Sequence, residues 1–96
     1  TGIYYKTTSL SYTIGTNSEE IVESRVTSAG GIYSLPSPVG NNNKYTIKNM
    51  SAYDLGVWVY GYTIDDTTSG GAGKVTLTPL DSVTLVSDGV SNYIII

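Results

Sequence analysis

Residues 74–96 read KVTLTPLDSVTLVSDGVSNYIII, and this stretch decides the fold class. It divides into three short runs, 74–78, 82–87 and 91–96, that are rich in Val, Thr, Ile and Tyr. Branched and aromatic side chains suit the pleated surface of a sheet, whereas the Pro and Asp-Gly segments between the runs suit turns. The stretch therefore predicts three strands joined by two turns, with the middle strand paired to the last one.

Alternation of side chains assigns the faces of these strands. In the middle run Val83 and Leu85 share one face, which we expect to be core. The final run is apolar on both faces, so we expect it to be buried, either under a second sheet or against another subunit. The same periodicity predicts buried positions along the chain, namely Ile47, Val57, Val59, Ile64, Val83 and Leu85.

The rest of the chain also consists of short strand-like runs separated by turn-forming residues. We interpret 20–27 as a strand rather than a short helix, because it is short, rich in branched residues and flanked by Gly and Asn clusters. The other expected features are strands at 3–8 and 10–14 (paired, or one long bent strand), 32–35, 45–49 and 56–63, and turns or loops at 15–18, 28–31, 40–43 and 67–73. Together they predict a small antiparallel β-sandwich, jelly-roll-like, in which residues 1–96 form a single all-β domain.

Composition excludes several function classes. The chain has a formal net charge of −3 and only five basic residues, which argues against binding nucleic acid or an anionic membrane surface. No apolar run is long enough to insert into a membrane. The chain has no Cys and no His, so thiolate and imidazole chemistry is absent. We therefore predict no metal site and no cofactor.

The carboxylates do not form a catalytic pattern. Asp65 and Asp66 are adjacent, so on a strand they would point to opposite faces and would not act as a glycosidase pair. The remaining Asp residues, at 54, 81 and 88, lie in turn contexts where Asp accepts backbone hydrogen bonds. Glu19, Glu20 and Glu23 are expected to form a solvated edge that discourages strand addition. We predict no catalytic residues and no enzymatic activity.

An aromatic row is the best candidate for a binding site. Trp58, Tyr60 and Tyr62 occupy every second position of the run 56–63, and Tyr53 and Asp54 lie in the preceding turn. Flat exposed rings beside polar side chains suit stacking on sugars. Tyr and Trp are also enriched at subunit interfaces. A glycan-binding site and a subunit interface both remain open interpretations of this row.

Several motifs in one order resemble a family. They are LPS at 35–37, Gly40, YTIKN at 45–49, the Val-x-Val run at 57–59, TID at 63–65, LTPLDSVTLVSDG at 77–89 and YII at 93–95. Over roughly residues 20–96 they resemble a β-module of bacteriophage tail fibres and tailspikes. The chain departs from the family pattern at Asn92, where an aromatic residue is frequent, and in an enlarged turn at 49–56.

The resemblance implies a virion protein of the phage tail, assembled in the bacterial cytoplasm. It implies a homotrimer near the tip of a fibre that binds a host polysaccharide or lipopolysaccharide. The chain starts at Thr1 without Met, so we expect a C-terminal fragment of a longer fibre or spike protein. The alternatives are a trimerisation or capping domain without ligand, and a fragment of a glycan-degrading or autoprocessing tailspike enzyme.

Overall fold

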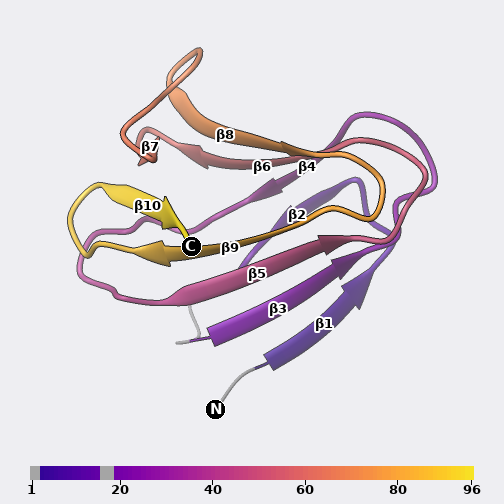
Figure 1. Ribbon diagram of the computed structural model, residues 1–96, viewed down its shortest axis with the longest axis horizontal. Coiled ribbons are helices and arrows are strands. Elements are labelled where there is room, and N and C mark those ends of the chain that lie inside the picture. The colour runs from indigo at the N-terminus through magenta and orange to yellow at the C-terminus, as the bar shows by residue number, and fades with distance from the viewer. Residues whose placement is uncertain (1–2, 16–18) are drawn as a thin grey trace.

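The structure, a computed structural model, describes residues 3–15 and 19–96 and contains two β-sheets (Figure 1). One sheet has six strands in the order β1-β3-β5-β9-β10-β7, and the other has four in the order β2-β4-β6-β8. The strands are β1 (Ile3–Thr7), β2 (Ser11–Thr13), β3 (Glu19–Ser24), β4 (Gly31–Ser34), β5 (Lys44–Asn49), β6 (Leu55–Tyr60), β7 (Thr63–Ile64), β8 (Ala72–Leu77), β9 (Ser82–Ser87) and β10 (Asn92–Ile95). No helix occurs among the described residues. The all-β prediction is confirmed, including the choice of a strand at 20–27.

The first six strands alternate between the two sheets. Because β1, β3 and β5 are parallel neighbours in one sheet and β2, β4 and β6 are parallel neighbours in the other, the chain winds as a short solenoid. Ile3 pairs with Glu20, and Glu20 pairs in turn with Tyr45. Equivalent positions of successive coils therefore lie side by side.

This winding corrects the expected antiparallel arrangement. Among the described strands, five of the eight pairings are parallel. The physical reason is that alternation reports which face of a strand is buried and carries no information on the direction of its neighbour. The jelly-roll-like arrangement is not confirmed.

The last third of the chain adds antiparallel strands to this solenoid. β8 pairs with β6, and β9 pairs with both β5 and β10. The turn after β8 is closed by Thr78, whose hydroxyl donates to the Asp81 carboxylate at 2.7 Å. The turn after β9 is closed by Asp88, which accepts three backbone N–H groups at 2.8–3.1 Å. The N–H of Val90 and its neighbours hold the pKa of Asp88 below its usual value. Both predicted turns are confirmed.

Both sheets bury one face in a shared core. All six residues predicted to be buried belong to it. Three tyrosines from different strands are also fully buried, and Tyr33 and Tyr93 donate their hydroxyls to the carbonyls of Ser9 and Pro36 at 3.0 and 2.7 Å. Burial raises the pKa of Tyr93. These bonds satisfy the polar end of each ring where it meets the core boundary.

Three other expectations are corrected. The runs 3–8 and 10–14 do not pair with each other, because β1 and β2 belong to different sheets. The glutamates of β3 do not form a sheet edge, because β3 lies between β1 and β5 and Glu20 is only 2% exposed. β8 begins at Ala72, inside the loop expected at 67–73. The turn expected at 15–18 lies, for residues 16–18, outside the described residues.

The C-terminal strand is buried only in its first half, at Asn92 and Tyr93. Tyr93 is fully buried, whereas Ile94, Ile95 and Ile96 are 43%, 39% and 69% exposed. Burial of the whole run under a second sheet is therefore wrong for the single chain. Burial against another subunit stays a prediction.

Candidate functional site

The second face of the four-stranded sheet points toward solvent, and two of the aromatic candidates, Trp58 and Tyr60, lie on it. On β6 every second residue is buried, starting with Leu55, so the residues between them point away from the core. Cross-strand pairing places Ser34 of β4 and Lys74 of β8 on either side of Trp58. We call this surface the aromatic platform, and its residues are Ile32, Ser34, Gly56, Trp58, Tyr60, Lys74 and Thr76.

Trp58 is held in place by three neighbours. Its ring lies edge-to-face with Tyr60, with 5.7 Å between the ring centroids. The ammonium nitrogen of Lys74 is 4.2 Å from the centroid of the indole. The indole also extends over Gly56, where an added Cβ would come within 2.7 Å of Nε1. Glycine at this position leaves the room that the indole needs, so the platform has a defined geometry before any ligand arrives.

The platform carries two small polar side chains beside its aromatic rings. Ser34 and Thr76 offer hydroxyls next to the rings, and Tyr60 is 56% exposed. No pocket occurs in the part of the chain that the structure describes.

The predicted aromatic row is shorter than the sequence suggests. Trp58 and Tyr60 share the solvent face, but β6 ends at Tyr60 and Gly61 follows with φ of +79°. This turn ends the alternation, and Tyr62 is half-buried and packs against the core. The expectation that Tyr62 continues the row is therefore wrong.

Tyr53 and Asp54 are exposed but lie apart from Tyr60. They precede β6, whereas Tyr60 is its last residue, so the length of this strand, about 20 Å, separates the two ends. The structure therefore brings Trp58 and Tyr60 together and leaves Tyr53 and Asp54 at the far end of the strand.

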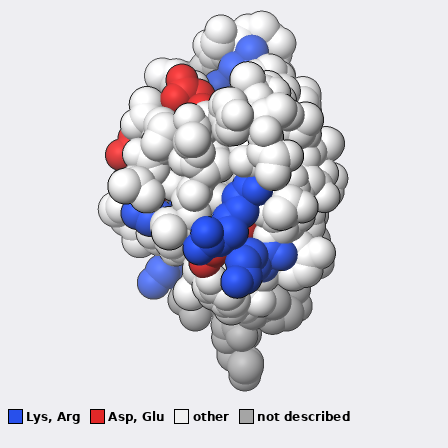
Figure 2. Space-filling view, turned by 90° about the vertical axis from the view of Figure 1, so that its right-hand side faces the viewer, with Lys and Arg blue, Asp and Glu red and all other residues white. Residues whose placement is uncertain are grey.

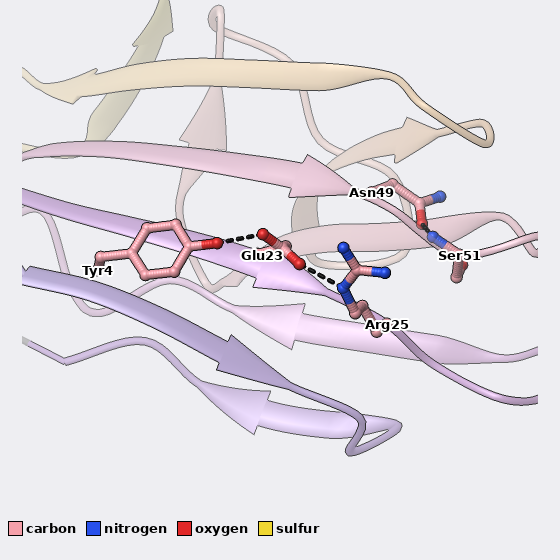
Figure 3. Close-up of polar contacts among 5 residues, drawn as sticks. All are labelled: Tyr4, Glu23, Arg25, Asn49 and Ser51. Atoms are coloured by element: carbon pink, nitrogen blue, oxygen red, sulfur yellow. Dashed lines mark hydrogen bonds and ion pairs between the residues drawn. The ribbon is translucent and has the colours of Figure 1, made fainter.

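A buried asparagine fixes the turn that carries Tyr53. The Asn49 side-chain amide donates to the carbonyl oxygens of Tyr53 and Leu77 at 2.7 and 2.9 Å. Its oxygen accepts the backbone N–H and the hydroxyl of Ser51 at 3.0 and 2.7 Å (Figure 3). Sequence reasoning missed this residue, although an Asn at the start of a turn is a known signal for such bonding.

Three aspartate carboxylates, those of Asp65, Asp81 and Asp88, have structural roles. Asp65 and Asp66 have φ of 48° and 63°, and Asp65 accepts the N–H of Ile95 at 3.0 Å. The turn roles predicted for Asp81 and Asp88 are those described above. Among the described residues, no group of three or more His, Cys, Asp and Glu side chains is arranged to hold a metal ion.

A cationic cluster lies on the other sheet. Lys6, Glu23 and Lys48 are in register on β1, β3 and β5. Arg25 forms an ion pair with Glu23 (Figure 3), and Figure 2 shows basic side chains gathered around acidic ones on one face of the molecule. The Tyr4 hydroxyl also donates to Glu23, and the bonds from Tyr4 and Arg25 hold the pKa of Glu23 below its usual value. The Lys48 ammonium donates to the carbonyl of Leu80. The central carboxylate therefore partly neutralises this cluster.

Comparison with known proteins identifies no family for this chain. Neither a protein-family model, nor a curated protein, nor a solved structure matches this chain. Within residues 3–15 and 19–96 there is also no helix with the length and apolar character needed to cross a membrane.

Proposed function

We propose that this chain is a non-enzymatic module of a bacteriophage tail fibre or tailspike, part of the virion and assembled in the bacterial cytoplasm. In this proposal the aromatic platform contacts a host surface polysaccharide or lipopolysaccharide. The observation that carries the proposal is the edge-to-face pair of half-buried Trp58 and exposed Tyr60 on the solvent face of the sheet, with Ser34 and Thr76 on neighbouring strands.

The chemistry of the platform suits sugars. A sugar ring presents C–H groups to the face of an aromatic ring and hydroxyls at its edge. The platform offers both partners within one cross-strand row, because Ser34 and Lys74 are the direct neighbours of Trp58. The carboxylates of Asp81 and Asp88 bond within turns and that of Asp65 accepts the N–H of Ile95, and these structural roles favour binding over a glycan-degrading activity.

We propose that three copies associate through the solvent face of β9 and β10. Val86 pairs with Ile94, and the N–H of Ile96 bonds to the Thr84 carbonyl, so these residues share the face opposite to Leu85. Ile94 and Ile96 are among the exposed large hydrophobic residues. A domain of this size gains stability when such a surface is buried in an oligomer.

The two proposed surfaces lie on different sheets. The platform belongs to the sheet of β2, β4, β6 and β8, and the apolar strip of β9 and β10 belongs to the other sheet. A trimerisation or capping domain without ligand would need the strip alone. The exposed platform favours the ligand-binding form of the proposal.

The experiment is to replace Trp58 by alanine and to measure attachment and assembly separately. We expect Trp58→Ala to lose attachment to host cells or to immobilised host polysaccharide, because it removes part of the contact surface and the ring that supports Tyr60 edge-to-face. Light scattering should still give three copies of the 10.2 kDa chain, because the strip is untouched. Tyr4→Ala, which removes an exposed ring from the other sheet, is the matched control and should attach normally.

Two results would contradict the proposal. Unchanged attachment by Trp58→Ala would remove the platform from receptor binding. Dissociation of the Trp58→Ala assembly would show that the platform is a subunit interface, because hot-spot aromatics of an interface cause such a loss.

A further inference from the structure

Charge is segregated between the two sheets. All eight Asp and Glu residues lie either on β3 or in the segments between strands. The described strands β2, β4, β6 and β8 contain a single charged residue, Lys74. The chain as a whole has a net charge of −3, so a positive sheet face without any carboxylate runs against its overall charge.

The ammonium of Lys74, on the edge strand β8, lies over the indole of Trp58. Its nitrogen lies 4.2 Å from the Trp58 ring centroid, a distance at which the ring quadrupole attracts a cation. The described ion pairs do not include Lys74, so no described carboxylate neutralises it. An ammonium has three N–H donors, and a hydrogen bond from such a donor to a carboxylate is charge-assisted and strong.

We propose, resting on the function proposed above, that the platform recognises an acidic saccharide. The sugar ring stacks on the exposed ring of Tyr60 and the adjoining edge of Trp58, and a carboxylate on the sugar pairs with Lys74. The hydroxyls of Ser34 and Thr76 bond to neighbouring sugar hydroxyls. The ligand is therefore a polymer that carries uronic or sialic acid units.

The cationic cluster of the other sheet is a weaker candidate for the same ligand. Its cations surround the Glu23 carboxylate, which repels an incoming anion, and the Lys48 ammonium is bonded to the Leu80 carbonyl. Sequence reasoning treated the basic residues as scattered and so did not assign a role to Lys74. Its position beside Trp58 depends on the register of β6 and β8.

The test uses three acidic polymers, polygalacturonate, hyaluronate and polysialate, each beside its carboxyl-reduced neutral form. The wild-type assembly should bind at least one acidic polymer about five- to ten-fold more tightly than its neutral form, as one charge-assisted hydrogen bond allows, and added salt should reduce this preference. Lys74→Gln should remove the preference, and Lys74→Arg should keep it. Lys6→Gln removes an equal charge from the other sheet and should leave the preference unchanged.

Several outcomes would overturn the inference. Equal binding of the acidic and neutral forms by the wild type would do so. A result in which Lys6→Gln loses the preference for the acidic form and Lys74→Gln keeps it would also do so. Binding of neutral polymers that depends on Trp58 would reject the acidic ligand and leave the proposed function intact. Failure of the wild type to bind any of the three acidic polymers would also reject it, and the Trp58→Ala attachment assay would then decide the proposed function separately.

Discussion

Replacing Leu85 by alanine is expected to lower the free energy of unfolding by about 2–5 kcal/mol, the range for truncating a buried Leu. Leu85 is fully buried on β9, which is the strand that joins β5 to β10 in the six-stranded sheet. It pairs with the buried Tyr45 on one side and with Ile95 on the other. A cavity at this point therefore weakens the contact between the solenoid and the C-terminal strands.

Denaturant titration measures this effect, and Leu80→Ala is the matched control. Leu80 is 64% exposed in the turn after β8, so the same truncation there should change the free energy of unfolding by less than about 0.5 kcal/mol. A Leu85→Ala effect as small as that of the control would show that the inward face of β9 is assigned wrongly.

Replacing Asn49 by alanine is expected to cost at least about 2 kcal/mol of unfolding free energy. The substitution removes four hydrogen bonds, and each buried polar group that is left without a partner costs about 1–3 kcal/mol. The groups left behind include the carbonyl of Leu77 and the N–H of Ser51, which are buried with Asn49. The turn between β5 and β6 should loosen as a result.

Hydrogen exchange at the Ser51 amide and thermal unfolding together report this change. Asn42→Ala is the control, because Asn42 is exposed in the loop before β5. Protection of Ser51 that survives in Asn49→Ala, with stability equal to that of the control, would contradict the structural role of the buried amide.

Much of the local structure could be predicted from the sequence. Alternation identified the buried faces of β5, β6 and β9. In each of these strands apolar residues, including Ile47, Val57 and Leu85, occupy every second position, which is the period of a strand. The residue types of the turns identified the segments around Pro79 and Gly89. Proline has a fixed φ and Gly89 has a positive φ, and neither suits the interior of a strand.

The arrangement of the strands could not be predicted in the same way. The parallel winding of β1 to β6 depends on contacts between segments about 20 residues apart, and short polar connections between them gave no indication of direction. β3 was expected at an edge because of its glutamates, but pairing on both sides makes it internal and buries Glu20.

The candidate site was predicted in part. Trp58 and Tyr60 were identified because they oppose the buried Val57 and Val59. Tyr62 was assigned to the same row because the sequence does not show that Gly61 adopts a positive φ. Lys74 could not be placed beside Trp58 without the register of β8, which begins inside a segment that the sequence suggested was a loop.

The chain contains one tryptophan, so its fluorescence reports directly on the platform. In the proposed function, the platform contacts host glycan and the three copies associate through a different surface, the strip of β9 and β10. Titration of the protein with polysaccharide from the host surface should therefore give a saturable change in Trp58 emission, with no change in the number of chains in the assembly. Host polysaccharide that binds the protein and leaves Trp58 emission unchanged at saturation would contradict the claim.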